Sequence, residues 1–356
     1  MGARFPLHDA HAAAGAVFET RHGWEQPVSY GDPAGEYAAV RGGVGLIDRG
    51  DLGVVTVSGR DRASFMHALL SNEIKSLTPG QGCRASLLDV HGKVQVILTV
   101  LVGEEEILLL TPAGQAAATL EALDRFLFSE KVILKDTTGA LAILVLAGPG
   151  AAAVVGERGG SLPGQTAWSH RGTRVDGVEV ELVRGGPGSS EDEIWLLGPA
   201  ADGSRLWETI RGAGARPVGY DAQEALRIEA GVARYGVDVD GTVLLPEIPL
   251  ADLVSSTKGC YIGQEVVVRV RDRGHVNRHL RGLLVEGPDV PPPGAMILSG
   301  EVEIGRVTSA AWSYGRGRPV ALGFVRRQHA APGTSVALRA GDRCFAATVA
   351  DLPFAR

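Results

Sequence analysis

The chain has 356 residues, of which 45% are hydrophobic, and a formal net charge of −6 at pH 7. This length predicts two or three domains, and the negative charge argues against a general attraction to nucleic acid, so no direct nucleic-acid partner is expected. The three cysteines, Cys83, Cys260 and Cys344, share no C-x-x-C spacing, so neither a disulfide framework nor a metal site is predicted. No secretory signal and no long apolar run is visible, so we expect a cytoplasmic protein without membrane contact.

The first half of the chain alternates β-branched runs with amphipathic stretches. Asp61 is expected to cap the first helix, and Asp89-Val90-His91-Gly92 is a turn signal inside a hairpin. Strands are expected at residues 53–60, 83–102 (two strands) and 104–112, with helices at residues 62–71 and 116–128. This order predicts an α+β unit with helices on one face of a largely antiparallel sheet.

The second half begins with short apolar runs between residues 140 and 200, which are rich in glycine. Two helices are expected next, at residues 204–214 and 222–231, the second ending at Gly231. After residue 278 nearly everything is short strands and turns, at residues 279–287, 295–300, 303–312, 320–327, 335–341 and 344–353. Short strands at this spacing predict a small barrel or a sandwich.

Two stretches do not follow any hydrophobic period. RIEAGVARYGVDVDGTVLLPEIP, residues 227–249, places polar side chains on irregular backbone after a helix end, and such backbone needs hydrogen-bond partners. KGCYIGQE, residues 258–265, puts a lysine, a thiol, an aromatic ring and a carboxylate close together. The first stretch is either a solvated loop with ordinary caps or, together with KGCYIGQE, the lining of one pocket.

Together these stretches resemble the folate-binding YgfZ proteins, bacterial relatives of the glycine-cleavage T-protein (aminomethyltransferase). GAVFETRHGWEQPVSYGDPAGEYAAVR is similar to the amino-terminal segment of the T-protein, and EIGRVTSAAWS with ALGFV is similar to its carboxy-terminal barrel. The resemblance implies an α+β fold of three domains around a central pocket for tetrahydrofolate or a one-carbon derivative. It implies a discontinuous first domain (1–50 and 140–225), a middle α+β domain (51–139 and 226–277) and a barrel domain (278–356).

One departure from that family concerns catalysis. The T-protein carries paired acids after the hairpin glycine, and one of them acts on the folate nitrogen during aminomethyl transfer. This chain has Val96 and Ile97 there, or Gln95 in a shifted alignment. Because an aliphatic side chain cannot exchange a proton, we expect the chemistry of glycine cleavage to be absent even where the pocket persists.

The motif thiol is the candidate catalytic group. Cys260 follows Lys258 by two residues, and a nearby ammonium favours the thiolate. The alternatives are a buried cysteine that serves as a small hydrophobe or, less favoured, a cysteine hydrolase that uses His275 or His279. Cys83 and Cys344 lie in strand patterns and are expected in the core.

The candidate folate contacts are polar or aromatic residues of the resembling stretches: Glu193, Arg227, Tyr235, Trp24 and Tyr261. Glu193 suits the N–H edge of a pterin, although an exposed acid at a strand end is an equal alternative. Trp24 could stack on a ligand or pack in the core. His91 is expected to be an exposed turn residue.

The resemblance implies a folate-binding accessory protein that supports iron–sulfur cluster assembly or repair and, indirectly, tRNA modification. Its partners would be folate and iron–sulfur client or assembly proteins. The alternative is a tetrahydrofolate-dependent aminomethyltransferase or demethylase of the T-protein type. A third reading is a scaffold that keeps the fold without binding folate.

Overall fold

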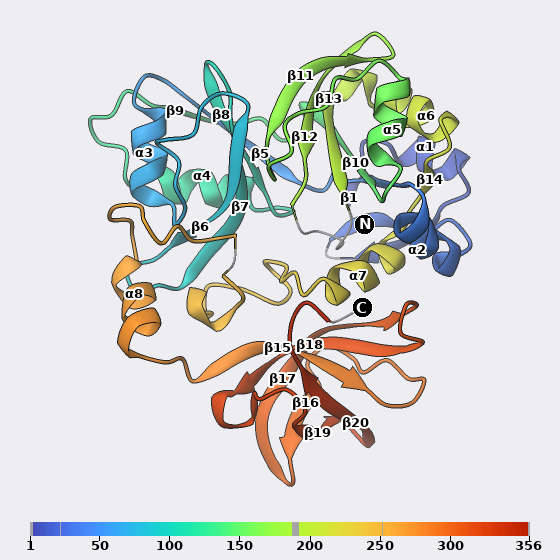
Figure 1. Ribbon diagram of the computed structural model, residues 1–356, viewed down its shortest axis with the longest axis vertical. Helices are drawn as coiled ribbons and strands as arrows, with labels where there is room; N and C mark the ends of the chain where they lie inside the picture. The colour runs from blue at the N-terminus through green and yellow to red at the C-terminus, as the bar shows by residue number, and fades with distance from the viewer. Residues whose placement is uncertain (1–2, 22, 187–191, 251, 355–356) are drawn as a thin grey trace.

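The computed structural model describes residues 3–21, 23–186, 192–250 and 252–354. In Figure 1 a closed barrel lies at the bottom, a six-stranded and a five-stranded sheet lie above it, and helix α7 (Tyr220–Glu229) runs between the upper right part and the barrel. The α+β class and the carboxy-terminal barrel are therefore confirmed.

The larger of the two upper sheets has the strand order β11-β12-β13-β10-β4-β14. Its strands are β4 (Gly45–Asp48), β10 (Leu141–Ala147), β11 (His170–Val175), β12 (Val178–Arg184), β13 (Glu193–Pro199) and β14 (Arg216–Pro217). Helices α5 (Ala151–Glu157) and α6 (Gly203–Gly212) pack on one face, where Trp207 is fully buried. The sheet thus joins two separate parts of the chain, as the resemblance implied; the domain boundaries themselves stay a prediction.

The amino-terminal elements complete this part of the molecule. They are β1 (Ala3–Arg4), α1 (His8–Ala13), β2 (Val17–Arg21), β3 (Trp24–Ser29) and α2 (Pro33–Gly42), with the three strands in the order β1-β3-β2. Helix α2 begins where Pro33 fits the first turn and the Asp32 carboxylate accepts a hydrogen bond from the Gly35 N–H at 3.0 Å. Neither α1 nor α2 was predicted from the sequence.

The second upper sheet is antiparallel throughout, in the order β6-β7-β8-β5-β9. It contains β5 (Gly53–Ser58), β6 (Gln81–Leu88), β7 (Val94–Val102), β8 (Glu106–Thr111) and β9 (Ile133–Asp136), with α3 (Arg62–Leu69) and α4 (Ala116–Asp124) packed against it. Helix α3 follows Asp61 as predicted, but the Asp61 carboxylate accepts from the Lys131 N–H at 2.8 Å and does not cap the helix.

Strand β7 separates two environments because successive side chains of a strand point to opposite faces. Val96 and Leu98 belong to the core under α3 and α4, together with Met66. Ile97 belongs to a different core cluster, which includes residues of the barrel and of the segment after α7. Of the two residues in the place of the family's acids, Val96 therefore faces the core of the middle sheet, and Ile97 faces the centre of the molecule.

The barrel closes with the strand order β15-β18-β17-β16-β19-β20. Its strands are β15 (Arg278–Val285), β16 (Met296–Ser299), β17 (Val302–Ser313), β18 (Arg318–Arg326), β19 (Ser335–Ala340) and β20 (Arg343–Ala350). Because these six strands close on themselves, the carboxy-terminal part is a barrel and not a sandwich, the two folds that the sequence allowed. The remaining helices are α8 (Gln264–Arg273) and the 3-10 turns η1 (Ala200–Asp202), η2 (Leu245–Glu247) and η3 (Arg327–His329).

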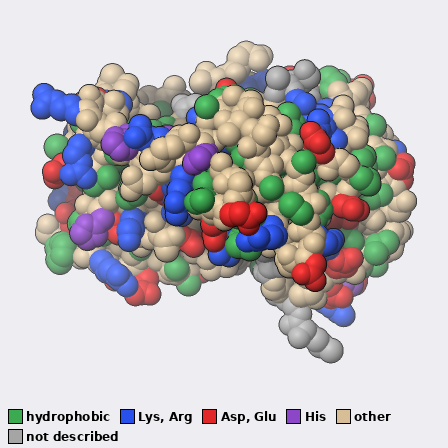
Figure 2. All heavy atoms as spheres, turned by 90° about the horizontal axis from the view of Figure 1, so that it is seen from below, with side chains coloured by type: hydrophobic (Ala, Val, Ile, Leu, Met, Phe, Trp, Pro, Cys, Tyr) green, Lys and Arg blue, Asp and Glu red, His purple; other side chains and the backbone are tan. Residues whose placement is uncertain are grey.

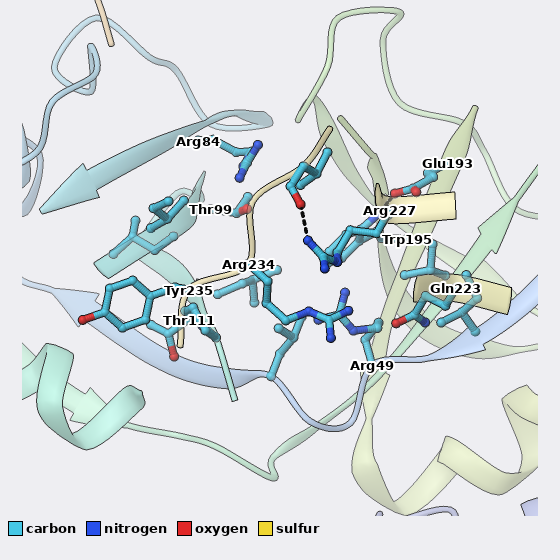
Figure 3. Close-up of a pocket in the computed structure, with 18 of the residues that line it drawn as sticks. Arg49, Arg84, Thr99, Thr111, Glu193, Trp195, Gln223, Arg227, Arg234 and Tyr235 are labelled. Carbon is cyan, nitrogen blue, oxygen red and sulfur yellow. Dashed lines mark hydrogen bonds between the residues drawn. The ribbon is translucent and has the colours of Figure 1, made fainter. Parts of the chain in front are cut away.

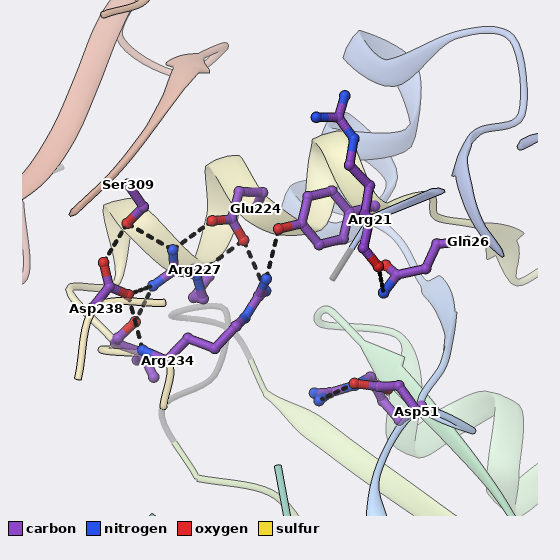
Figure 4. A network of polar contacts seen from close by, with 11 residues as sticks. Arg21, Gln26, Asp51, Glu224, Arg227, Arg234, Asp238 and Ser309 are labelled. Atoms are coloured by element: carbon purple, nitrogen blue, oxygen red, sulfur yellow. Dashed lines mark hydrogen bonds and ion pairs between the residues drawn. The ribbon is translucent and has the colours of Figure 1, made fainter. Parts of the chain in front are cut away.

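A buried ionic network joins α7 to the barrel (Figure 4). The Arg227 guanidinium donates to Glu224 on its own helix, to Asp238 at 2.7 Å and to the Ser309 hydroxyl of β17 at 2.9 Å. It also donates to the Val232 carbonyl at 2.6 Å. These bonds fix the loop from Val232 to Asp238 between α7 and β17.

The surface shows no segregation of charge on the face seen from below, where acidic and basic side chains are interspersed (Figure 2). Within the described residues, no helix is long and apolar enough to cross a membrane.

The network yields a stability prediction. Asp238→Ala removes the acceptor of Arg227, of the Ser309 hydroxyl and of the Arg234 N–H, and should lower the free energy of unfolding by about 3–5 kcal/mol. Urea denaturation followed by circular dichroism measures this loss. Glu179→Ala, which breaks an exposed pair with Arg174, is the matched control and should change little. Equal effects of the two substitutions would contradict a stabilising role for the network.

Candidate functional site

Two adjoining cavities lie at the centre of the molecule. The main pocket, of about 180 Å³, is lined by residues that include Ile97, Glu193 and Trp195. The side pocket, of about 340 Å³, is lined by residues that include Gln26 and Asp48. The two share part of their walls, namely Arg49, Pro112, Gln223, Arg234 and Tyr235.

The main pocket draws its walls from both upper sheets and from the loop after α7 (Figure 3). Ile97 and Thr99 come from β7, Glu193 and Trp195 come from β13, and residues 232–235 close the remaining side. Most of the lining is apolar, with a few polar groups at separate points. Such a pocket suits a flat heterocyclic ligand that is held by a small number of oriented hydrogen bonds.

Glu193 is the polar centre of one wall. It is only 6% exposed, so the alternative of an exposed acid at a strand end is excluded. Its carboxylate accepts a hydrogen bond from the Trp195 indole N–H at 2.9 Å, because residues two apart on a strand lie on the same face. Both side chains are buried, so the carboxylate is oriented before any ligand binds.

Arg49 stands within electrostatic reach of Glu193. Burial acts to lower the pKa of Arg49, but the carboxylate of Asp51 and, less strongly, that of Glu193 outweigh burial and raise the pKa. Asp51 accepts from the Arg49 Nε at 2.9 Å and from its Nη2 at 3.2 Å. Arg49 is therefore a permanent cation on the wall between the two pockets.

Arg227 was predicted as a direct folate contact, and its side chain does line the main pocket. However, a guanidinium has five N–H groups, and the bonds to Glu224, Asp238, Val232 and Ser309 occupy all of them. Arg227 therefore positions the pocket wall, and its polar head has no donor left for a ligand.

Tyr235 lines both pockets, which agrees with its predicted placement at a ligand site. Burial, with a smaller contribution from the charge of Asp240, raises the pKa of its hydroxyl. The hydroxyl therefore stays protonated at neutral pH and can donate a hydrogen bond.

The other two predicted aromatic contacts lie elsewhere. Trp24 packs edge to face against Phe5, with ring centroids 5.5 Å apart, and lines neither pocket. Tyr261 lines a third cavity of about 230 Å³, together with Lys258 and Gln264. The expectation that KGCYIGQE and the loop after α7 share one pocket is therefore wrong.

KGCYIGQE instead joins α8 to the middle sheet. The Lys258 ammonium donates to the carbonyls of His67 at 2.6 Å and of Leu70, at the carboxy-terminal end of α3, where carbonyls lack partners within the helix. It also donates to the carbonyl of Asn72, just after the helix, at 3.1 Å. Gly263 has a φ of +76°, and a Cβ there would lie 2.5 Å from the Asp89 carbonyl oxygen, so only glycine allows this contact with the β6–β7 turn.

The cysteines are not placed as expected. Cys260 is exposed, which excludes the alternative of a buried small hydrophobe, and it lines neither pocket. Cys344 is exposed as well, so its assignment to the core is wrong, whereas Cys83 is partly buried against the core of the middle sheet. Because the Lys258 ammonium donates to three carbonyls, we propose that it stabilises the fold. Activation of the Cys260 thiol by Lys258 stays a prediction.

Several polar residues of the main pocket were not predicted from the sequence: Arg49, Arg84, Thr99, Thr111, Gln223 and Arg234. Gln223 lies one helical turn before Arg227 on α7, and Thr99 lies two residues after Ile97 on β7, so periodicity could have found both. His91 is exposed as predicted. Within the described residues, no group of three or more His, Cys, Asp or Glu side chains is placed to hold a metal ion.

Known proteins similar to this chain match along almost its full length. A family model described as the GCVT N-terminal domain matches residues 7–258, and one described as the Glycine cleavage T-protein C-terminal barrel domain matches residues 278–355. A protein named Aminomethyltransferase from Streptomyces avermitilis is 30% identical over 352 residues, which covers 94% of this chain and 93% of that protein. Another of the same name from Streptomyces coelicolor is 31% identical and covers 93% of this chain and 91% of its own length.

The structural comparison agrees with the sequence relatives. The crystal structure of the glycine cleavage system aminomethyltransferase T from Bartonella henselae superposes with a TM-score of 0.90 at 26% identity, covering 100% of this chain and 98% of that one. These similarities support the T-protein superfamily without singling out its YgfZ-type members.

The comparisons overturn the main functional expectation. An accessory role in iron–sulfur assembly is wrong, because the relatives that match along the whole chain are named aminomethyltransferase. The alternative, a tetrahydrofolate-dependent transferase of the T-protein type, is favoured instead.

The environments of the three cysteines predict their reactivity. Burial raises the pKa of the Cys83 thiol to about 12, so only roughly one such thiol in ten thousand is ionised at pH 8. Cys260 and Cys344 should therefore be alkylated by iodoacetamide at pH 8 in the folded protein, and Cys83 should not be. Mass spectrometry of tryptic peptides measures this, with alkylation in urea as the control. Fast modification of Cys83 in the folded chain would contradict its burial.

Proposed function

We propose, on the premise that this chain belongs to the glycine-cleavage T-protein family, that it is a tetrahydrofolate-dependent one-carbon transferase of the aminomethyltransferase type. The observation that carries the proposal is the buried Glu193–Trp195 wall, which lines a pocket between the two upper sheets. It supports folate binding in a chain that resembles aminomethyltransferases from end to end.

The residues of the main pocket fit a reduced folate. Glu193 offers a buried carboxylate to the adjacent N–H groups of a pterin, and a charged acceptor strengthens such bonds. The Thr111 hydroxyl is buried and has no hydrogen-bond partner within the described residues, so a ligand or a water molecule can satisfy it. Thr99 and Gln223 supply further polar groups on the same walls.

In this reaction a methylene group passes from the aminomethylated carrier to the folate, the carrier thiol and ammonia leave, and protons must be exchanged as these bonds break and form. Tetrahydrofolate supplies the nucleophilic nitrogen when it is bound. Of the two residues on β7 that stand in the place of the family's acids, the one that lines the pocket is Ile97, which takes no part in proton transfer. Among the described residues that line the main pocket, Glu193 is the sole carboxylate. Because Glu193 is proposed to hold the N–H edge of the pterin, away from the reacting nitrogen, we propose slow turnover in which water carries the proton.

The KGCYIGQE run supports a finer placement beside the YgfZ-type members of the superfamily. In the proposed enzyme its lysine and its second glycine hold α8 on the middle sheet. Cys260 remains a proposed reactive thiol at the surface and is not needed for the transfer.

The test of this function is the formation of methylene-tetrahydrofolate from tetrahydrofolate and an aminomethylated lipoyl carrier protein. Wild-type protein should form the product. Glu193→Gln keeps the shape but loses the charge and should raise the KM for tetrahydrofolate about 10- to 100-fold. Glu179→Gln, on an exposed part of β12, is the control. Tight folate binding without any product would show that the protein binds folate but does not catalyse the transfer.

The two faces of β7 give a gain-of-function prediction. Ile97→Asp places a carboxylate on the pocket wall and should raise the rate of product formation by about 100-fold, the usual scale of a positioned acid or base. Val96→Asp is the matched control, because that carboxylate enters the core under α3 and should destabilise the protein without raising the rate. An unchanged rate in a folded Ile97→Asp protein would show that position 97 does not reach the reaction.

A further inference from the structure

The third cavity, of about 230 Å³, has no role in the function proposed above. It lies between the loop before KGCYIGQE and α8, the helix at the lower left in Figure 1. Among the described residues it shares no lining residue with the main pocket or the side pocket. Its volume is that of roughly eight water molecules, so it can hold a small organic molecule. The apolar part of its lining consists of Leu250, Val254, Val267 and Val268.

Tyr261 brings an unused hydrogen-bond donor to this cavity. The residue is only 8% exposed, yet its hydroxyl has no hydrogen-bond partner among the described residues. A buried tyrosine hydroxyl normally has such a partner. Burial raises the pKa of the hydroxyl, and the charge of Arg271 opposes that rise only in part. The hydroxyl is therefore protonated at neutral pH and can donate to a ligand in the cavity.

Lys258 gives the wall of the cavity a positive charge that no described carboxylate neutralises by a direct ion pair. Its ammonium donates to three carbonyls and lies 5.0 Å from the centre of the Tyr261 ring. Burial lowers the pKa of Lys258 to about 8 and outweighs the opposite effect of the Glu73 carboxylate, so the group is still mostly charged at pH 7. An anion in the cavity would stabilise that charge.

Arg271 adds a second cation near the Tyr261 hydroxyl. It lines the cavity, and its charge acts on the pKa of Tyr261. Its pair with Asp272 is exposed, at 50% and 47% of the two side chains, and exposed pairs contribute little stability. Among the described residues, no Asp or Glu lines the cavity. The polar part of the lining therefore offers positive charge and a hydroxyl donor without a carboxylate.

We propose that the third cavity is a binding site for a small organic acid with an apolar body. The apolar body packs against the leucine and the three valines, and the carboxylate accepts hydrogen bonds from the Tyr261 hydroxyl and the Arg271 guanidinium. The buried charge of Lys258 stabilises the bound anion without donating to it, because its N–H groups are taken by carbonyls. The inference goes beyond the proposed folate function and does not depend on it.

Calorimetric titrations of the full chain at pH 7 test the proposal. The probes are hexanoate, hexanol, which lacks the charge, and acetate, which lacks the apolar body. Wild type should bind hexanoate about 10- to 100-fold more tightly than either of the other two, because only hexanoate uses both parts of the lining.

Substitutions in the lining locate the bound acid. Tyr261→Phe and Arg271→Met should each weaken hexanoate binding about tenfold, and Arg271→Met should leave hexanol binding within about twofold of wild type. Val268→Phe fills the cavity and should weaken both ligands. Arg269→Met is the matched control, because Arg269 is an exposed cation of α8 that does not line the cavity, and it should bind hexanoate like wild type. Circular dichroism checks that every variant is folded.

The inference is overturned if wild type binds hexanoate no more tightly than hexanol and acetate, or if folded Tyr261→Phe and Arg271→Met bind it within about twofold of wild type. Loss of binding in Arg269→Met equal to that in Arg271→Met would overturn it as well. Saturating tetrahydrofolate should leave hexanoate binding unchanged, and displacement of hexanoate would place the acid in the main pocket and contradict the proposal. A wild type that binds no tetrahydrofolate is a failure of the proposed function alone, since the hexanoate titrations do not require folate.

Discussion

The arrangement of the segments at the centre of this molecule depends on the Arg227 guanidinium, whose N–H groups all have hydrogen-bond acceptors. It links α7 to the loop at Asp238 and to Ser309 of the barrel, two partners that are 11 and 82 residues away in sequence. Because all five of its N–H groups are satisfied, the charge is tolerated in a site that is only 5% exposed. The residues between these anchors, from Val232 to Tyr235, form a wall of the main pocket, so the ligand site takes its shape from a buried ionic network.

The second constraint is the alternation of β7. The strand presents Val96 to the helices of the middle sheet and Ile97 to the pocket, and the pleat fixes which of them can act on a ligand. A chain of the T-protein family can therefore keep the fold and a central pocket with the aliphatic Ile97 at the position of the family's acids. Polar contacts on the facing strand, above all Glu193 with Trp195, are independent of that substitution.

The sequence allowed the middle sheet, helices α6 and α7 and the strands of the barrel to be predicted, because each depends on local periodicity and turn chemistry. It also pointed to Glu193 and Tyr235 at the pocket. It could not reveal that Lys258 pairs with carbonyls 186 to 191 residues away, or that Arg227 has no spare donor. Such pairings arise only when distant segments meet, and for that reason the motif around Cys260 was assigned to the wrong cavity.

The specific motif also led to the wrong function. KGCYIGQE is a local signal, and its lysine and second glycine hold α8 against the β6–β7 turn and the end of α3. The similarity to aminomethyltransferases extends over nearly the whole chain and includes the strands that form the pocket. Evidence that is spread over the fold therefore outweighs a short run of residues in assigning the chemistry.

The central claim is that a reduced folate binds between β7 and β13. The most direct test is a crystal structure of the protein with bound tetrahydrofolate. We predict that the pterin ring lies in the main pocket, with its N–H edge on the Glu193 carboxylate and with Ile97 on the opposite wall. A folate bound elsewhere, or a pterin that makes no contact with Glu193, would contradict it.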